Sequence, residues 1–289
     1  MEIGKIYKFI VDRETKLGYV LTDAFNEDSE EEFFLHHNEC NGRVLKIGES
    51  VNAFLYVDKK NRIAATLFNP IITLKEVALL KVVTQNREIG LFIHNGISKD
   101  ILLPKEDLPT NYRLWPEADD YLPVVLLYRQ GKLVMKLANK ERIIERCLKE
   151  DRLKRDDRVT GFIYRITGDG INVVTEDYEV VYIYKTNYRG TFRLGEKVDV
   201  RIIDIHEKDY SGTMIEKKEV QIQDDKKIIL EYLNNHNGVM LITEESSPEL
   251  INRLFNMSKG SFKKAIGGLL KENKIEILKD KIILNDFDI

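Results

Sequence analysis

Residues 170–184 read GINVVTEDYEVVYIY, two short runs rich in β-branched and aromatic residues on either side of a polar turn. This pattern is typical of two adjacent β-strands. Side chains alternate between the two faces of a strand, so Val181 and Ile183 share one face and Tyr182 and Tyr184 share the other. The aliphatic pair suits the interior of a small barrel, which places the two tyrosines on its outer surface.

The same arrangement occurs three times in the first 220 residues. A glycine opens the second strand of each copy, at Gly18, Gly90 and Gly170, at intervals of roughly 70–80 residues. Each copy has about five short strands, the size of a five-stranded OB-fold barrel. From about residue 224 the pattern changes to helices, which indicates a separate domain.

The C-terminal region has the element order of a winged helix. Residues 224–235 are amphipathic, and a short strand is expected at 239–243. Ser247 and Ser258 are typical N-caps of two further helices. Residues 275–284 alternate in the manner of a β-hairpin.

These patterns predict a mainly β protein with an α+β C-terminal domain: three tandem five-stranded OB-fold barrels followed by a winged helix. The charged segment 140–158 has a helical pattern and is expected to be a solvated helix that precedes the third barrel, and the acidic run 27–32 is expected to be a solvated loop. The expected domains are residues 1–68, 69–139, 140–220 and 221–289.

The composition excludes several classes of function. The 45 basic and 48 acidic residues give a net charge of −3, so nucleic-acid binding requires local patches. No apolar run approaches the ~20 residues that span a bilayer, and the N-terminus lacks a signal-peptide pattern, so we expect no membrane partner. The two cysteines, Cys40 and Cys147, fit no disulfide or zinc spacing. We expect a cytoplasmic protein with no metal, no other cofactor and, since no phosphate loop or nucleophile–base pair is evident, no catalytic residues.

Aromatic and basic residues on the outer barrel faces are candidates for binding single-stranded RNA. An exposed ring can stack on an unpaired base, and arginine or lysine can contact phosphate. The opposite interpretation is that the rings cover a neighbouring domain and the charges are merely solvated. The barrel candidates are Phe34, His36, Arg62, Phe92, Lys132, Tyr182, Tyr184, Arg189 and Arg193.

The third helix of the winged helix carries a second set of candidates. Its polar face presents Lys263, Lys264 and Lys271, which can contact phosphate. Gly267 and Gly268 lie on the same helix, where each glycine costs about 1 kcal/mol relative to alanine. Close approach of a ligand and a tight helix crossing are both sufficient reasons for them.

Four parts of the chain carry a resemblance to a known family. They are DLP and LWP at 107–109 and 114–116, RLGE at 193–196, SSPE at 246–249, and FNMSKGSFKKAIG at 255–267. Together these residues resemble the conserved virulence factor B family of bacteria. The resemblance implies three S1-type OB-fold domains and a winged helix. It also implies an RNA-binding protein that regulates gene expression after transcription and, in some pathogens, virulence-factor production.

S1-type domains share a histidine after the third strand and an Asp and an Arg around the last turn, and the first copy matches with His36, Asp58 and Arg62. Its second strand lacks the usual aromatic pair but has Tyr19, which the resemblance adds as a candidate. The third copy has Tyr184 at the histidine position, and the second copy has a proline there. The resemblance therefore implies that the third copy and the winged helix bind RNA, that the first copy binds weakly and that the second is structural.

Two other functions stay open beside the single-stranded RNA-binding regulator. The lysine face of the winged helix would also suit duplex nucleic acid, as in a DNA-binding transcription regulator. The outer aromatic side chains would also suit a protein-interaction scaffold, in which they bind a partner protein.

Overall fold

The computed structural model describes residues 1–26, 31–58, 60–148, 152–216 and 218–285, so most of the predicted acidic loop lies outside the described residues. The chain divides into two compact units. One comprises Met1–Tyr182 with Phe192–Gly212, and the other comprises Ile183–Thr191 with Thr213–Ile289. No described helix is long and apolar enough to cross a membrane.

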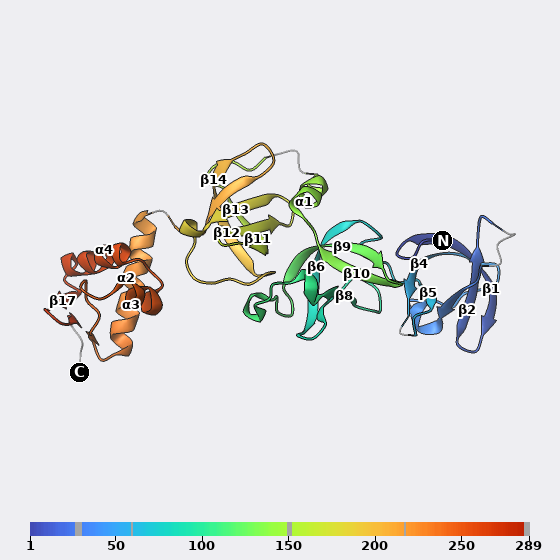
Figure 1. Ribbon diagram of the computed structural model, residues 1–289, viewed down its shortest axis with the longest axis horizontal. Coiled ribbons are helices and arrows are strands. Elements are labelled where there is room, and N and C mark those ends of the chain that lie inside the picture. The colour runs from blue at the N-terminus through green and yellow to red at the C-terminus, as the bar shows by residue number, and fades with distance from the viewer. Residues whose placement is uncertain (27–30, 59, 149–151, 217, 286–289) are drawn as a thin grey trace. The chain divides into compact units, whose positions relative to one another are not determined.

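The first copy is a closed barrel with the hydrogen-bonded order β1-β2-β3-β5-β4 (Figure 1). Strands β3 and β5 run parallel, and all other neighbours are antiparallel. The interior is filled by fully buried aliphatic and aromatic side chains such as Phe9, Leu21 and Leu35. The elements are β1 (Ile6–Thr15), β2 (Gly18–Asp23), β3 (Phe33–His36), the 3-10 turn η1 (His37–Glu39), β4 (Ser50–Val57) and β5 (Ile63–Thr66).

The second copy has the same cyclic strand order, but its sheet is open. Its order is β10-β9-β6-β7-β8, and within this fully described stretch no hydrogen-bonded pairing joins β8 to β10. The predicted OB-fold order of strands is therefore confirmed in this copy too, although hydrogen bonds do not close its sheet. The elements are β6 (Val77–Asn86), β7 (Gly90–Ile93), β8 (Ile101–Pro104), η2 (Lys105–Asp107), η3 (Tyr112–Leu114), β9 (Tyr121–Arg129) and β10 (Lys132–Leu137).

The third copy is again a closed barrel, in the order β11-β12-β13-β15-β14. The helix before it is shorter than predicted, because Leu153 is buried and its N–H donates to the Tyr210 hydroxyl, which holds that segment on the barrel. The elements are α1 (Lys140–Arg146), β11 (Arg158–Ile166), β12 (Gly170–Thr175), β13 (Val180–Tyr184), η4 (Lys185–Asn187), β14 (Lys197–Ile205) and β15 (Tyr210–Thr213).

A shared irregularity supports the internal repeat. The first strand of each copy shifts register near its middle, at Val11/Arg13, Val82/Thr84 and Ile163/Arg165. Such a bulge bends a strand and increases its twist. The bend lets one long strand pair with two different neighbours, which a small barrel requires.

The C-terminal domain is a winged helix, as predicted. Ser247 and Ser258 cap α3 and α4 by accepting hydrogen bonds from the N–H groups of Leu250 and Ser261. The helices enclose an apolar core that includes the stacked rings of Phe255 and Phe262. The elements are α2 (Lys218–Asn235), β16 (Val239–Met240), α3 (Pro248–Phe255), α4 (Lys259–Lys271), β17 (Ile275–Ile277) and β18 (Ile282–Leu284), with the sheet order β16-β18-β17.

The glycine that opens β2 is required by the close approach of β3. An added Cβ at Gly18 would overlap the carbonyl oxygen of Leu35, so we expect Gly18→Ala to lower the free energy of unfolding by about 3 kcal/mol. Gly168→Ala is the control, because no atom lies within 4 Å of an added Cβ there. Urea denaturation followed by circular dichroism measures both, and equal stability of the two variants would contradict the prediction.

Candidate nucleic-acid interface

Strand β13 carries aromatic side chains on its outer face. Val181 and Ile183 are fully buried, Tyr182 is half-buried, and Tyr184 is 53% exposed. The predicted alternation is confirmed at all four positions. The strand therefore places two phenol rings on the side opposite to the barrel core.

Strand β3 of the first barrel repeats this arrangement. Phe34 and His36 are half-buried on the outer face, with ring centroids 6.2 Å apart in an edge-to-face arrangement. His36 also caps η1, since its Nδ1 accepts a hydrogen bond of 3.1 Å from the N–H of Asn38. An accepting Nδ1 leaves Nε2 as the N–H donor of the neutral ring. The cap thus fixes which edge of the imidazole can donate to a ligand.

Tyr19 does not lie on this outer face, so its prediction as a stacking residue is wrong. It is 2% exposed and pairs across the sheet with Leu35, whose side chain points into the core. Its hydroxyl accepts a hydrogen bond from the N–H of Leu45, and its ring meets His37 edge-to-face. Cross-strand partners share a face, so the register of β2 buries this ring.

Arg62 is held by Asp58 at the end of the first barrel. Its Nε and Nη2 donate to Asp58 Oδ2 at 3.0 and 2.7 Å, while 63% of the arginine side chain stays exposed. Partial desolvation acts to raise the pKa of Asp58, but hydrogen bonds from Arg62 and from the backbone of Lys60 keep this pKa below its usual value. The pair is solvent-facing, so a phosphate can still approach the guanidinium.

The candidates in the second copy lie apart from one another. Phe92 is half-buried on β7, and Lys132 is exposed at the start of β10. These strands are not neighbours in the hydrogen-bonded order. The two residues therefore lie on strands that are not hydrogen-bonded to each other.

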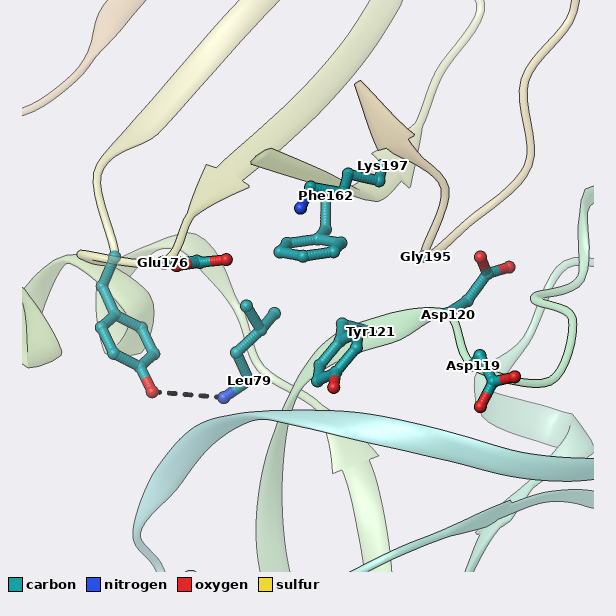
Figure 2. A pocket seen from close by; sticks show the side chains of 9 residues that line it. Leu79, Asp119, Asp120, Tyr121, Phe162, Glu176, Gly195 and Lys197 are labelled. Carbon is teal, nitrogen blue, oxygen red and sulfur yellow. Dashed lines mark hydrogen bonds between the residues drawn. The ribbon is translucent and has the colours of Figure 1, made fainter. Parts of the chain in front are cut away.

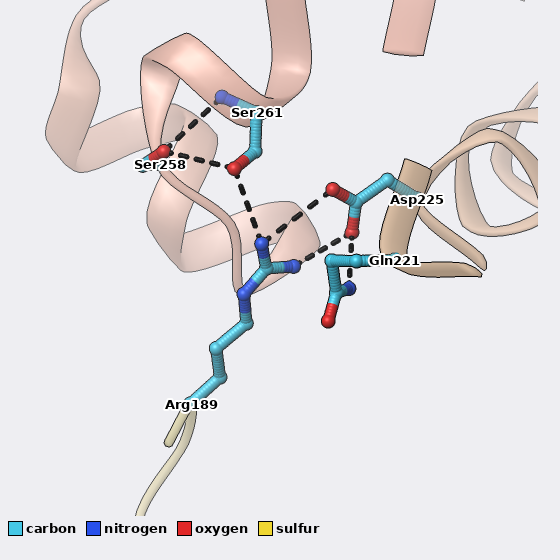
Figure 3. A network of polar contacts seen from close by, with 5 residues as sticks. All are labelled: Arg189, Gln221, Asp225, Ser258 and Ser261. Carbon is cyan, nitrogen blue, oxygen red and sulfur yellow. Dashed lines mark hydrogen bonds and ion pairs between the residues drawn. The ribbon is translucent and has the colours of Figure 1, made fainter. Parts of the chain in front are cut away.

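Arg189 is part of a polar network within the C-terminal unit rather than a solvated cation (Figure 3). Its Nη1 lies 2.6 Å from Oδ1 of Asp225, whose side chain is only 1% exposed, and its Nη2 donates to Ser261 Oγ at 3.1 Å. Gln221 donates to the same carboxylate, and Ser258 contacts Ser261. Both Nη atoms of the guanidinium are thus engaged within this network.

Arg193 is likewise committed to carboxylates. Its Nε and Nη2 donate to the two oxygens of Asp120 at 2.9 and 3.1 Å, and Glu117 and Glu196 lie within 3.4 Å. Desolvation acts to lower the pKa of Arg193, but these acidic partners raise it above the usual value. Arg189 and Arg193 thus both lie in ion pairs with carboxylates, a placement that the sequence did not predict.

An aromatic slot with a volume of about 440 Å³ lies beside this ion pair, and the sequence analysis missed it (Figure 2). The rings of Tyr121 and Phe162 are 5.2 Å apart, and Lys197 Nζ lies 5.7 Å from the Phe162 centroid. The slot is assembled from β9 and β11, far apart in the sequence, so no single strand pattern reveals it. Its rim carries the carboxylates of Asp119, Asp120 and Glu176, which oppose a phosphate.

The three candidate lysines of the winged helix lie on the exposed side of α4. Lys263 approaches Glu244 at 3.4 Å. Lys264 and Lys271 are exposed, and neither forms an ion pair with a described residue. Together they give this helix a basic outer face.

The two glycines of α4 have different surroundings. An added Cβ at Gly268 would overlap the side chain of Lys226, which reaches across from α2 to Glu272. Gly268 therefore leaves room for the Lys226 side chain where α2 and α4 pack against each other. Gly267 has no atom within 4 Å of an added Cβ and faces open space beside the lysines.

Among the described residues, no three His, Cys, Asp or Glu side chains are placed to hold a metal ion.

Loss of the Arg189 side chain should destabilise the C-terminal unit. Arg189→Ala leaves the buried carboxylate of Asp225 without its cation, so we expect the free energy of unfolding to fall by about 3 kcal/mol. Arg253→Ala is the matched control, because Arg253 is exposed on α3 and forms no ion pair with any described residue. Thermal unfolding of both variants measures this effect. If Arg189→Ala were as stable as the wild type, the prediction would be contradicted and Arg189 would again be a candidate phosphate contact.

Four segments of the chain match known protein families. Residues 3–67 match the S1 domain, 78–142 the "CvfB first S1-like domain", 145–213 the "Virulence regulatory factor CvfB, second domain", and 227–284 the "CvfB-like winged helix domain".

Whole proteins of similar sequence and fold also exist. The chain is 31% identical over 277 residues to the uncharacterized protein YitL of Bacillus subtilis, covering 95% of this chain and 91% of that protein. It is 34% identical over 245 residues to conserved virulence factor B of Staphylococcus aureus, covering 83% and 81%. A crystal structure of a multidomain protein with nucleic acid binding domains from Streptococcus pneumoniae has a TM-score of 0.60 at 24% identity, with 98% of each chain covered, and shows the same fold.

Proposed function

The chain belongs to the conserved virulence factor B family, and from this we propose that it is a regulatory protein that binds single-stranded RNA and acts on gene expression after transcription. The match of residues 3–67 to the S1 domain supports nucleic-acid binding in general. The two S1-like segments that follow extend this support over most of the chain.

Tyr182 and Tyr184 point outward on β13, and this observation favours single-stranded over double-stranded nucleic acid as the ligand. Bases of a duplex are stacked on one another, whereas those of a single strand can stack on aromatic side chains. Phe34 and His36 offer a second surface of the same kind on β3. The proposed role is binding, because both pairs of rings lie on outer strand faces where unpaired bases can stack on them.

Phosphate contacts would come from cations whose side chains stay exposed to solvent. Lys132, Lys264 and Lys271 are exposed and form no ion pair with any described residue, and Arg62 keeps most of its side chain in solvent. These exposed cations give local positive charge to a chain whose net charge is −3. Short-range interactions, rather than the overall charge, would therefore provide the affinity.

Removing the outer tyrosines should weaken RNA binding at every salt concentration. We expect Tyr182→Ala combined with Tyr184→Ala to lower the affinity for single-stranded RNA at least about tenfold, since stacking contributes about 1–3 kcal/mol per base. The salt slope should stay unchanged, because the two tyrosines neutralise no phosphate. Fluorescence anisotropy with labelled RNA over a salt series measures both quantities.

The matched control for this experiment is Tyr128→Ala, which removes a 44% exposed tyrosine from β9. Wild-type affinity in the double variant, or no binding by the intact protein at low salt, would contradict the proposal. A partner protein that stays bound after nuclease treatment would then favour the scaffold function.

Duplex DNA is the second candidate ligand, because the basic face of α4 and the open space at Gly267 would also suit a duplex backbone. We expect duplex DNA to compete weakly against single-stranded RNA.

We also expect Lys263→Ala, Lys264→Ala and Lys271→Ala together to lower the salt slope for RNA by about 0.7 for each phosphate that these lysines neutralise. A matched triple substitution of exposed lysines at Lys16, Lys46 and Lys105 is the control. A duplex preference that the first triple variant abolishes would make DNA the ligand.

A further inference from the structure

A polar pocket of about 500 Å³ lies on the second S1-like domain, between the β6–β7 hairpin and the loop that precedes β9. None of the residues predicted from the sequence to bind RNA lines it. The side chains that matter for its chemistry are Gln85, Arg87, Asn111, Tyr112, Arg113 and Trp115.

The floor of the pocket is a fixed aromatic pair. Trp115 is 3% exposed, and its indole N–H donates to the carbonyl of Pro109 at 2.7 Å. The ring of Tyr112 meets it edge-to-face with centroids 4.9 Å apart, yet Tyr112 is 47% exposed. Asn111 caps η3 by accepting from the N–H of Arg113 at 3.0 Å. The exposed phenol ring is thus held in place by a buried partner and a capped turn.

The cations of the pocket lack carboxylate partners. Arg87 lies over the Tyr112 ring at 5.7 Å, and neither it nor Arg113 forms an ion pair with any residue that the structure describes. One acidic residue, Glu117, lines the pocket, and its carboxylate lies 3.3 Å from the Arg193 guanidinium. By contrast, Arg62, Arg189 and Arg193 all bind carboxylates. The two guanidinium groups of the pocket keep their charge available for an external anion.

We propose that this pocket binds one nucleotide, with its base stacked on the Arg87 guanidinium that lies over the Tyr112 ring and its phosphate held by Arg113; the inference rests on the proposed function where that nucleotide is part of an RNA strand. A guanidinium stacks on bases and binds phosphate. Asn111 uses its carbonyl oxygen in the cap, so its amide N–H groups stay available for an acceptor on a base edge. Gln85 adds a second amide at the pocket wall.

A nucleotide fits this site better than a phosphorylated peptide does. A phosphate group alone would need only the cations, whereas the half-exposed ring with a guanidinium above it offers a plane for a flat base. The same chemistry could come from a nucleotide within an RNA strand or from a free mononucleotide. The second domain, expected from the sequence to be structural, would in either case take part in binding.

The chain contains one tryptophan, and it lies in this pocket. Tryptophan emission of the full-length protein therefore reports on the site directly. We would titrate the protein with a single-stranded oligoribonucleotide, with each of the four nucleoside monophosphates, with inorganic phosphate and with a phosphorylated peptide, and follow emission and RNA anisotropy in parallel. We expect emission to change with the oligonucleotide or a mononucleotide and not with the peptide.

The decisive variant combines Arg87→Ala with Arg113→Ala, two exposed side chains whose removal breaks no ion pair among the described residues. We expect this variant to bind about tenfold more weakly to whichever ligand changes the tryptophan emission. A tenfold loss of affinity corresponds to about 1.4 kcal/mol. Arg129→Ala is the matched control, because Arg129 is exposed on β9 and does not line the pocket.

The outcomes separate this inference from the proposed function. RNA binding by anisotropy with unchanged tryptophan emission, and with equal affinity in the double arginine variant, would overturn the pocket and leave the proposed function standing. A mononucleotide response that the double variant loses, without any RNA binding, would support the pocket and overturn the proposed function. A response to the phosphorylated peptide or to inorganic phosphate alone would overturn the assignment to nucleotides.

Discussion

The alternation of side chains along the short barrel strands is the constraint on which the rest of the structure depends. In the two closed barrels one face of each strand lines the interior, and Leu35 and Ile183 are completely buried there. Their neighbours Phe34 and Tyr184 then project outward, because successive side chains of a strand point to opposite faces. The outer aromatic side chains thus follow from the packing of the core. Their use in binding depends on which other groups of the protein lie over them.

Features that depend on residues close in sequence could be predicted. The two faces of β13, the caps Ser247 and Ser258 and the winged-helix order all follow from spacing within a few residues. The repeat could be recognised because Gly18 and Gly90 occupy equivalent positions, where an added Cβ would overlap the backbone of the next strand. These signals act through the backbone, so they are visible in a single sequence.

Features that depend on register or on distant partners could not be predicted. Tyr19 is buried because β2 pairs it with Leu35, and the sequence does not state that register. Arg189 and Arg193 find their carboxylates 36 and 73 residues away along the chain. An arginine that binds Asp and an arginine that binds phosphate have the same chemistry, so their sequence neighbours do not distinguish them. The pocket proposed to bind a nucleotide was missed for the same reason, since the β6–β7 hairpin and the η3 turn meet only in the folded domain.

The distinction between paired and unpaired cations follows from energetics. Moving Arg189 to a phosphate would leave the carboxylate of Asp225 buried without a counter-charge, a loss of about 3–5 kcal/mol. A phosphate interaction at the protein surface returns less than this, so such an arginine stays with its carboxylate. Arg87 and Arg113 have no carboxylate partner among the described residues to give up. In a chain with a net charge of −3, where no overall field attracts a polyanion, the unpaired cations beside exposed rings are therefore where the proposed RNA ligand would gain binding energy without cost to the fold.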